Sequence, residues 1–513
     1  GYQRALVPRQ IPLMEETPLR IPQIRRSEGL ARVSDFISGC DPLQIPARTT
    51  CSILLDQTFL TNAYPELILS GGKGATVRLA YGEALFDSHK QKGNRNEIDG
   101  RTIELTHYDI VRPDGAEGRL YRPVWFRTYR YIQLDITTAG DPLTIEDLYG
   151  RFTGYPFTER GSFSCDDPGL AKIWEVGWRT ARLCAMETYF DCPYYEQLQY
   201  ISDSRFDLLS LYELSGDIRL AENALRQFAE GQYSSGMLPC RYPTREHAQY
   251  HATPGELYQL HIPSFTSFYI QLLHDFARLR RNDALVCELL PVARRAADYL
   301  NSTLGEDQLL HAPGWNFIDW LDNWEAGIPP GCRYGEGCTL NLIHLLSLQQ
   351  LADLEQCFGS ARQAALRQEQ AARLKQAIRH TYWIDERNCF AEDSVRSYVS
   401  EHAQVFALLA LNERAVIPVL RSGTLDECGI AFSFYYLEAC RIHRLDDLFA
   451  RRRERYFQAA ETPGLRTMPE LFPNDWWQRS DCHAWGAHFL YFQFTAGTIL
   501  DPIPRAILPE AQP

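Results

Sequence analysis

Hydrophobic and polar positions alternate with a period of two over roughly residues 50–145. Such alternation predicts half-buried β-strands. Two clear examples are the apolar series Val77, Leu79, Tyr81 and Ile132, Leu134, Ile136, which are interleaved with residues such as Arg78, Gln133 and Asp135. Turn signals at Ser70-Gly71-Gly72 and Pro113-Asp114-Gly115 separate the strands. The pattern therefore predicts antiparallel connections and a jelly-roll-like β-sandwich domain over residues 46–165.

From about Asp166 the apolar period becomes that of a helix, and one face collects Leu170, Ile173, Trp174, Ala181, Cys184 and Ala185. Further helices are expected at 203–214, 218–231, 265–280, 284–300, 340–357 and 361–380, with Gly or Pro at the joints. About a dozen helices in consecutive pairs fit an (α/α)6 barrel or an open α-solenoid. No fixed short repeat is visible, which favours the closed barrel, a six-hairpin toroid, over residues 166–499.

The two ends of the chain show neither period. Four prolines lie between Pro8 and Pro22, so residues 1–45 are expected to be a linker or a partial upstream segment, and 500–513 a C-terminal tail. No stretch of eighteen apolar residues and no signal-peptide pattern is present. A soluble, multidomain α and β protein is expected; its localisation stays unknown, with a secreted or periplasmic one open if the N-terminus is trimmed.

The composition limits the kinds of partner that the protein is expected to bind. The chain has 513 residues, 12% of them aromatic, with 10 Trp and 27 Tyr, a composition suited to stacking on sugar faces. The net charge of −13 opposes binding to a nucleic-acid backbone. The 14 cysteines are scattered without a CxxC pair, so most are expected to be buried free thiols. A carbohydrate partner is expected, without nucleic acid or membrane, and the oligomeric state is left open.

The densest polar cluster, residues 189–203, lies between the end of one predicted helix and the start of the next. It holds three carboxylates, Asp191, Glu196 and Asp203, among aromatic side chains. Carboxylates that are close together push their pKa values apart, which keeps one of them protonated near neutral pH. The alternative is structural: Asp203 caps a helix, and Glu196 is a solvated loop residue.

Two further clusters combine Trp with acidic residues. Residues 314–325 contain Trp315, Asp319, Trp320 and Trp324 and predict a platform for a polar ligand with flat faces, or alternatively a plug at the barrel end. Residues 467–483 contain Glu470, Trp477 and His483.

Motifs of other chemistries are missing. The sequence has no GxSxG, GxxxxGK, GxGxxG or HExxH motif. The spacing of His247 and His251 is metal-like, but Pro243 and Pro254 flank the pair, and a structural role is expected. We therefore expect neither a metal nor a cofactor.

At these clusters the chain resembles the α-L-rhamnosidase family of inverting glycoside hydrolases. The resemblance covers most of residues 50–500 and rests on Asp191-Cys192-Pro193 with Glu196 and Asp203, on Trp125-Phe126-Arg127, on 316–320 and on 479–485. It implies Glu196 as general acid and Glu470 as general base. It also implies substrate binding by a wider set: Asp191, Tyr195, Asp203, Arg241, Trp315, Asp319, Trp320, Trp324, Trp477 and His483.

One departure concerns the residue before the implied acid. Tyr195 stands where the family usually has Arg, which removes a cation near Glu196 and leaves the sugar specificity open. The expected function is an inverting exo-glycosidase that hydrolyses terminal α-L-rhamnosyl residues. The alternatives are an inverting glycosidase for another sugar, such as an α-L-arabinoside or a glucuronide, and a non-catalytic carbohydrate-binding protein.

Overall fold

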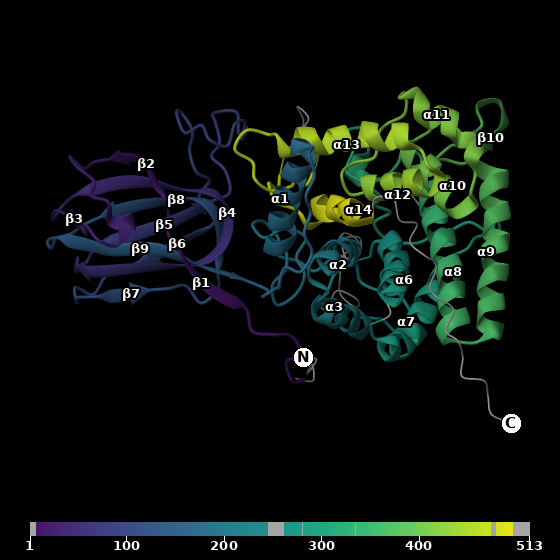
Figure 1. Cartoon of the computed structure of the whole chain (residues 1–513), viewed down its shortest axis with the longest axis horizontal. Helices are drawn as coiled ribbons and strands as arrows, with labels where there is room; N and C mark the ends of the chain where they lie inside the picture. Colours follow the sequence, from purple (N-terminus) through teal and green to yellow (C-terminus); the bar gives the residue numbers. More distant parts are fainter. Residues whose placement is uncertain (1–6, 245–260, 280, 334, 473–478, 496–513) are drawn as a thin grey trace.

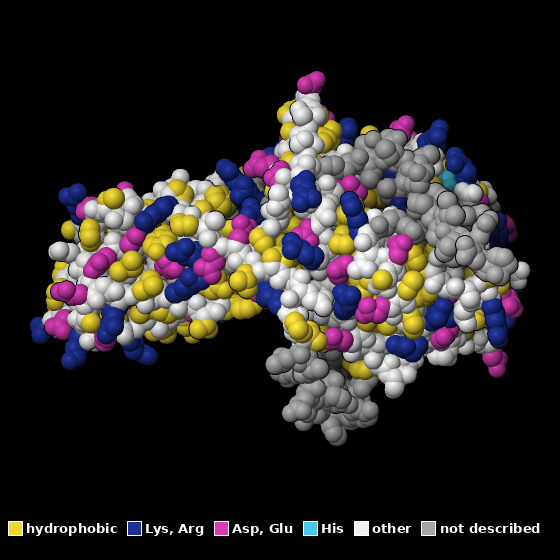
Figure 2. All heavy atoms as spheres, turned by 60° about the horizontal axis from the view of Figure 1, so that its bottom comes forward, with side chains coloured by type: hydrophobic (Ala, Val, Ile, Leu, Met, Phe, Trp, Pro, Cys, Tyr) yellow, Lys and Arg dark blue, Asp and Glu magenta, His cyan; other side chains and the backbone are white. Residues whose placement is uncertain are grey.

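The computed structural model describes residues 7–244, 261–279, 281–333, 335–472 and 479–495. A sheet domain comes first and a helical domain follows it (Figure 1). On the face drawn in Figure 2, basic and acidic side chains are interspersed over the sheet domain. Among the described residues, no helix is both long enough and apolar enough to cross a membrane.

Antiparallel pairing organises the sheet domain, and its main strand order is β1-β9-β4-β8-β5-β6. The remaining strands pair at the sides, β2 and β7 with β4 and β3 with β9. The strands are β1 (Glu15–Leu19), β2 (Gln23–Glu28), β3 (Leu43–Ile45), β4 (Thr50–Gly71), β5 (Thr76–Gly82), β6 (Tyr108–Val111), β7 (Arg119–Tyr121), β8 (Arg127–Thr137) and β9 (Leu143–Gly154).

Strand β4 carries the chain between the two layers of this domain. Its register with β8 shifts between Asp56 and Thr61, where Thr58 has a φ of 69°. The first half of β4 pairs with β2 and the second half with β9 and β7. Buried residues from both halves, such as Ile53 and Leu67, share one hydrophobic core. The predicted antiparallel sandwich is confirmed.

The predicted linker over residues 1–45 needs correction, because this segment contributes β1, β2 and β3 to the sheet. Its prolines do not prevent pairing: Pro18 lies in β1, an edge strand, opposite Arg151. An edge strand tolerates a residue that has no N–H to donate. Ile21 and Ile45 are buried in the core of the domain, so hydrophobic burial helps to order a segment whose composition suggested none.

The helical domain is a toroid of hairpins. Helices that bury one face lie outside, and helices buried nearly all round lie inside (Figure 1). The outer ones are α1 (Pro168–Leu183), α3 (Arg219–Glu230), α7 (Asp283–Asn301), α9 (Ala361–Tyr382), α11 (Ile417–Ser422) and α13 (Asp446–Ala460). The inner ones are α2 (Ile201–Ser215), α6 (Pro263–Arg278), α8 (Cys338–Phe358), α10 (Glu401–Leu411), α12 (Ser433–His443) and α14 (Phe489–Thr495), which follows a short helix at Ala484–His488.

The inner ring is closed. Each inner helix from α2 to α12 contacts the next, and the last segment, Ala484–Thr495, contacts α2 again. The ring centroids of Phe434 on α12 and Phe492 on α14 are 5.5 Å apart. An open solenoid has no contact between its first and last elements. The contact of Ala484–Thr495 with α2 therefore confirms the closed barrel. The predicted C-terminal tail, residues 500–513, lies outside the described residues.

Candidate active site

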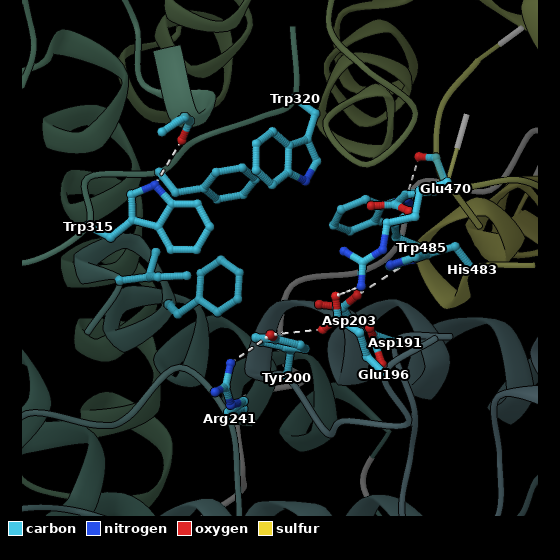
Figure 3. Close-up of a pocket in the computed structure, with 15 residues that line it drawn as sticks. Asp191, Glu196, Tyr200, Asp203, Arg241, Trp315, Trp320, Glu470, His483 and Trp485 are labelled. Carbon is cyan, nitrogen blue, oxygen red and sulfur yellow. Dashed lines mark hydrogen bonds and ion pairs between the residues drawn. The ribbon is translucent and has the colours of Figure 1, made fainter. Parts of the chain in front are cut away.

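A cavity of about 410 Å³ opens at the mouth of the barrel (Figure 3). Side chains from five parts of the helical domain line it: the 191–203 cluster, Arg241, the start of α6, the 315–326 loop and the 470–485 segment. Eight residues named from the sequence are among them: Asp191, Glu196, Asp203, Arg241, Trp315, Trp320, Glu470 and His483. The fold thus gathers residues that are far apart in the chain.

Asp191 anchors the loop of the first cluster. Its backbone N–H donates to the carbonyl of Leu198, and its Oδ1 accepts from the Leu198 N–H at 2.9 Å. Gln197 closes this turn in the left-handed region, with a φ of 55°. The Asp191 carboxylate is buried, and burial together with the charges of Glu196 and Asp203 raises its pKa well above the usual value.

Asp203 lies in the first turn of α2 but does not cap that helix, because Tyr200 occupies the N-cap position. Burial raises the pKa of Asp203 to about 8, so the carboxyl group is protonated at neutral pH. Among the described residues its Oδ1 has no hydrogen-bond partner, and Nδ1 of His483 is 3.7 Å away. This geometry argues against the helix-capping alternative.

His483 provides a neutral polar group beside Asp203. Burial lowers the pKa of His483 well below the usual value, and the nearby positive charge of Arg479 lowers it further. The imidazole stacks on Trp485 with ring centroids 3.9 Å apart. Its orientation is therefore fixed by packing, while Nδ1 has no hydrogen-bond partner in the part of the chain that the structure describes. A neutral imidazole with a free nitrogen can exchange a hydrogen bond with a ligand hydroxyl.

Glu196 is held by partners on both oxygens. Oε1 forms an ion pair with Arg479, and Oε2 accepts from the hydroxyl of Tyr200 at 3.1 Å. Arg241 donates in turn to that hydroxyl at 2.9 Å. The side chain remains 23% exposed, so it is in reach of a ligand. The alternative of a solvated, unconstrained loop carboxylate does not fit this arrangement.

Glu470 is the second carboxylate at the cavity wall, and it is more deeply buried. Its Oε2 accepts from the backbone N–H of Ser480 at 3.2 Å, and its carbonyl accepts from Nε1 of Trp485 at 2.7 Å. Burial raises the pKa of Glu470, and the charge of Arg479 lowers it in part. Arg479 therefore acts on both glutamates.

An aromatic wall faces these carboxylates across the cavity (Figure 3). Trp315, Phe317 and Trp320 pack on one another with ring centroids 5.0–5.9 Å apart. Nε1 of Trp315 donates to the carbonyl of Ala326 at 2.8 Å, which fixes its ring. One wall is thus apolar and flat while the other is polar and acidic, an arrangement that suits a ring with one apolar face and several hydroxyls.

Two of the residues named from the 314–325 cluster, Asp319 and Trp324, are buried and lie outside the cavity lining. Oδ2 of Asp319 contacts Nε2 of His402 at 2.9 Å and accepts from the Gly429 N–H at 2.7 Å. Nε1 of Trp324 donates to the Tyr398 hydroxyl at 2.8 Å. Both residues support the loop that presents Trp315 and Trp320, and the spacing along the chain did not distinguish the two sides.

Tyr195 also lies outside this cavity, behind Glu196. Its ring is 5.4 Å from the guanidinium carbon of Arg479 and 5.5 Å from Nζ of Lys92. Arg479 thus supplies a cation beside Glu196, although Tyr195 replaces the Arg of the family pattern. The expected loss of that cation is corrected. Trp477 lies outside the described residues.

Several lining residues were not singled out from the sequence: Tyr200, Ile262, Phe265, Phe317, Ala326, Arg479 and Trp485. Arg479 and Trp485 belong to the 479–485 stretch that carries the family resemblance, which was the available signal. Tyr200 lies within the first cluster, residues 189–203, but no role was assigned to it. Phe265 and Ile262 carry no signal, because their apolar side chains look like helix core.

The sheet domain reaches this site through a buried ionic cluster. Nζ of Lys92 contacts Glu83, the carbonyl of Arg479, and Oδ1 of Asp481 at 3.2 Å. Arg95 pairs with Asp481 at 2.8 Å. All four ionic side chains are at most 3% exposed. No sheet-domain residue had been expected to serve the site, yet this cluster holds the segment that carries Arg479.

Within the described parts of the chain, no group of three or more His, Cys, Asp and Glu side chains could hold a metal ion. The cavity lining combines an aromatic wall with two glutamates. One of them is ion-paired and partly exposed, and the other is buried. Carboxylate pairs of this kind perform acid–base chemistry at glycosidic bonds.

Comparisons with known proteins show the family and the fold of the chain. The sequence model of the bacterial α-L-rhamnosidase six-hairpin glycosidase domain matches residues 158–416. A rhamnosidase from Klebsiella oxytoca, solved with rhamnose bound, is 16% identical, with a TM-score of 0.78 over 95% of this chain and 97% of that one. A comparison with curated protein sequences finds no match.

Two longer solved proteins are also similar. A family 78 rhamnosidase from Bacillus sp. GL1 is 24% identical, with a TM-score of 0.75 over 90% of this chain and 47% of that one. An α-L-rhamnosidase from Streptomyces avermitilis, complexed with L-rhamnose, is 19% identical, with a TM-score of 0.61 over 93% and 44%. The chain spans about half the length of these two proteins. By its sequence match over half its length and by its fold, the chain belongs to the family of bacterial α-L-rhamnosidases with a six-hairpin glycosidase domain.

Proposed function

We propose that this protein is an inverting exo-glycosidase that releases terminal α-L-rhamnosyl residues from glycans or glycosides. The observation that carries the proposal is the cavity itself, where Glu196 and Glu470 face Trp315 and Trp320. Membership of the rhamnosidase family supports the choice of sugar. The aromatic wall suits the apolar face and methyl group of a 6-deoxy sugar.

In the proposed reaction Glu196 is the general acid and Glu470 the general base. Glu196 gives a proton to the glycosidic oxygen as the bond from that oxygen to the anomeric carbon breaks. Glu470 takes a proton from a water molecule whose oxygen bonds to the same carbon from the opposite face. Inverting pairs keep roughly 6.5–9.5 Å between their carboxyl groups, which leaves room for that water.

The contacts of Arg479 set a requirement on this mechanism. Arg479 forms an ion pair with Glu196. A general acid must be protonated. The proposal therefore requires Arg479 to leave Glu196 when a sugar enters. A shift of its charge toward Glu470 would also help to keep the base ionised, since Arg479 already lowers the pKa of that residue.

The other lining residues are proposed to bind the sugar. Asp203, protonated at neutral pH, donates a hydrogen bond to a hydroxyl. Asp191 and His483 complete the polar side, and Arg241 fixes the hydroxyl of Tyr200 beside Glu196. A carboxyl group and a neutral imidazole together read hydroxyl positions on the ring, which is how the site would distinguish one sugar from another.

A panel of p-nitrophenyl glycosides tests this proposal. Wild type and Glu196→Gln are assayed on the α-L-rhamnoside, the α-L-arabinoside and the β-D-glucuronide, with Glu386→Gln, an exposed glutamate outside the cavity lining, as the matched control. The proposal expects release from the rhamnoside by wild type and the control. Preference for another sugar would favour the related glycosidases. Sugar binding without any hydrolysis would favour a carbohydrate-binding protein.

A further inference from the structure

A second cavity, of about 360 Å³, lies between the sheet domain and the loop that carries Glu196. Its walls come from β5, β6, β8 and the segments before β6 and β8 in the sheet domain, and from residues 194–197 in the helical domain. Glu196 lines both this cavity and the barrel cavity. A single residue, the one that we place at the glycosidic bond, thus stands between the two spaces.

The walls of the second cavity are largely aromatic. Trp125 and Tyr108 are 45% and 49% exposed, unusual values for large aromatic side chains. Nε1 of Trp125 donates to Oε1 of Gln197 at 2.9 Å, so the indole is fixed and not free to turn. His107 and Tyr194 also line the cavity and pack on each other with ring centroids 4.7 Å apart. Fixed, exposed aromatic faces are suited to stacking against a flat ring.

The charges around the cavity are already neutralised. The guanidinium of Arg127 donates two hydrogen bonds to the carboxylate of Asp109, at 2.6 and 3.0 Å. Burial lowers the pKa of His107, which keeps the imidazole neutral at neutral pH. Among the described lining residues, no cation is thus left to pair with an anionic ligand, and a buried anion without a partner is unfavourable.

We propose that this cavity binds the leaving group of the substrate, and that it selects a neutral group with a flat ring next to the scissile bond. The proposal rests on the function proposed above. Because the acid must touch the glycosidic oxygen, the sugar and the leaving group lie on either side of it. The barrel cavity accepts the sugar, and the space on the other side of Glu196 accepts the ring that departs. A neutral sugar ring and an aromatic ring share this chemistry.

Four substrates separate these possibilities. α-L-Rhamnosyl fluoride has no ring in its leaving group, 4-methylumbelliferyl α-L-rhamnoside carries an aromatic one, and rhamnosyl glucoside and rhamnosyl glucuronate carry a neutral and an anionic sugar. Each is assayed with wild type, Trp125→Ala and Trp125→Phe. The Phe variant keeps a flat ring but loses the bond to Gln197, so it separates stacking from an indirect effect on Glu196. Leu120→Ala, which removes an exposed apolar side chain of β7, is the control on the same domain.

We expect Trp125→Ala to lower kcat/KM about ten-fold on the glucoside, the umbelliferyl substrate or both, with less than a two-fold change on the fluoride. The substrate with the larger loss identifies the kind of ring. Trp125→Phe should keep most of the activity. Wild type should hydrolyse the glucuronate at least ten-fold less well than the glucoside.

Equal losses on the fluoride and the ring-bearing substrates, or no loss on either, would overturn the assignment of the second cavity. A glucuronate as good as the glucoside would overturn the selection for a neutral ring. Failure of wild type on the fluoride is a different result: it would contradict the proposed function, and this inference with it, because the inference presumes a glycosidic bond at Glu196.

Discussion

The guanidinium of Arg479 is paired with the carboxylate of Glu196, and its charge also lowers the pKa of the buried Glu470. One cation thus acts on both proposed catalytic groups. It comes from the 470–485 segment, which is tied to the sheet domain through Lys92 and Asp481. The protonation of the site therefore depends on contacts that reach well beyond the cavity.

Replacing Arg479 should change both the rate of hydrolysis and its dependence on pH. Without the Arg479 charge, the pKa of Glu470 rises further, and the base is ionised only at higher pH. For Arg479→Gln we expect kcat/KM to fall at least ten-fold at neutral pH and the acidic limb of its pH profile to move to higher pH. Arg479→Lys should retain a limb closer to that of wild type. A lower rate with an unmoved limb would contradict the role given to this charge.

The proposed role of Glu470 as general base should be separable from sugar binding. Glu470→Gln keeps the shape of the side chain and its bond to Ser480 but cannot accept a proton from water. We expect hydrolysis to be lost, while the inhibition constant of free L-rhamnose for a trace substrate, or its Kd by calorimetry, stays within a few-fold, because the base serves the transition state. A large loss of L-rhamnose affinity would instead make Glu470 a binding residue.

Asp191 should serve binding as well as rate. Asp191→Asn preserves an acceptor for the Leu198 N–H, so the loop should keep its form. We expect weaker L-rhamnose binding by calorimetry together with a lower kcat/KM. Unchanged affinity for the free sugar would exclude Asp191 from the sugar contacts.

The raised pKa of Asp203 predicts how the stability of the protein depends on pH. The pKa of this group is about 8 in the folded protein against an ordinary value of 3.8. The stability that it contributes is thus fully present below about pH 4 and is lost as the pH rises through about 8. Asp203→Asn, which cannot ionise, should lose less Tm than wild type between pH 6 and pH 9. Parallel Tm curves for the two proteins would show that Asp203 is not the group that titrates.

The buried ionic cluster should be needed for stability. Removing Lys92 leaves Glu83 and Asp481 buried with one cation fewer. We expect Lys92→Met to lower the free energy of unfolding by about 3–5 kcal/mol in urea denaturation. The exposed pair of Arg119 and Asp114 gives the comparison, and Arg119→Met should cost less than about 1 kcal/mol. Similar losses in both variants would contradict the importance of burial.

The periodic segments of the chain predicted the architecture well. Alternation in β5 and β8 and the helical period from α1 onward depend on local spacing, which the sequence displays directly. The strands within residues 15–45 were missed, because their order comes from pairing with β4 and β9, which lie far along the chain.

The candidate site was predicted in part, for a similar reason. The acidic and Trp-rich clusters marked the correct loops. The spacing could not show that Trp315 and Trp320 face the cavity while Trp324 lies beneath the loop. The contact between Arg479 and Glu196 joins distant loops, so the apparent loss of a cation at Tyr195 could be resolved only in three dimensions.

The central claim, inverting hydrolysis of an α-L-rhamnoside, is tested most directly by proton NMR of the first sugar released. Wild type is mixed with p-nitrophenyl α-L-rhamnoside, and the anomeric signals are followed before mutarotation equalises them. The account predicts β-L-rhamnose as the first product, because water attacks from the face opposite the leaving group. First appearance of α-L-rhamnose, or no release of sugar, would contradict it.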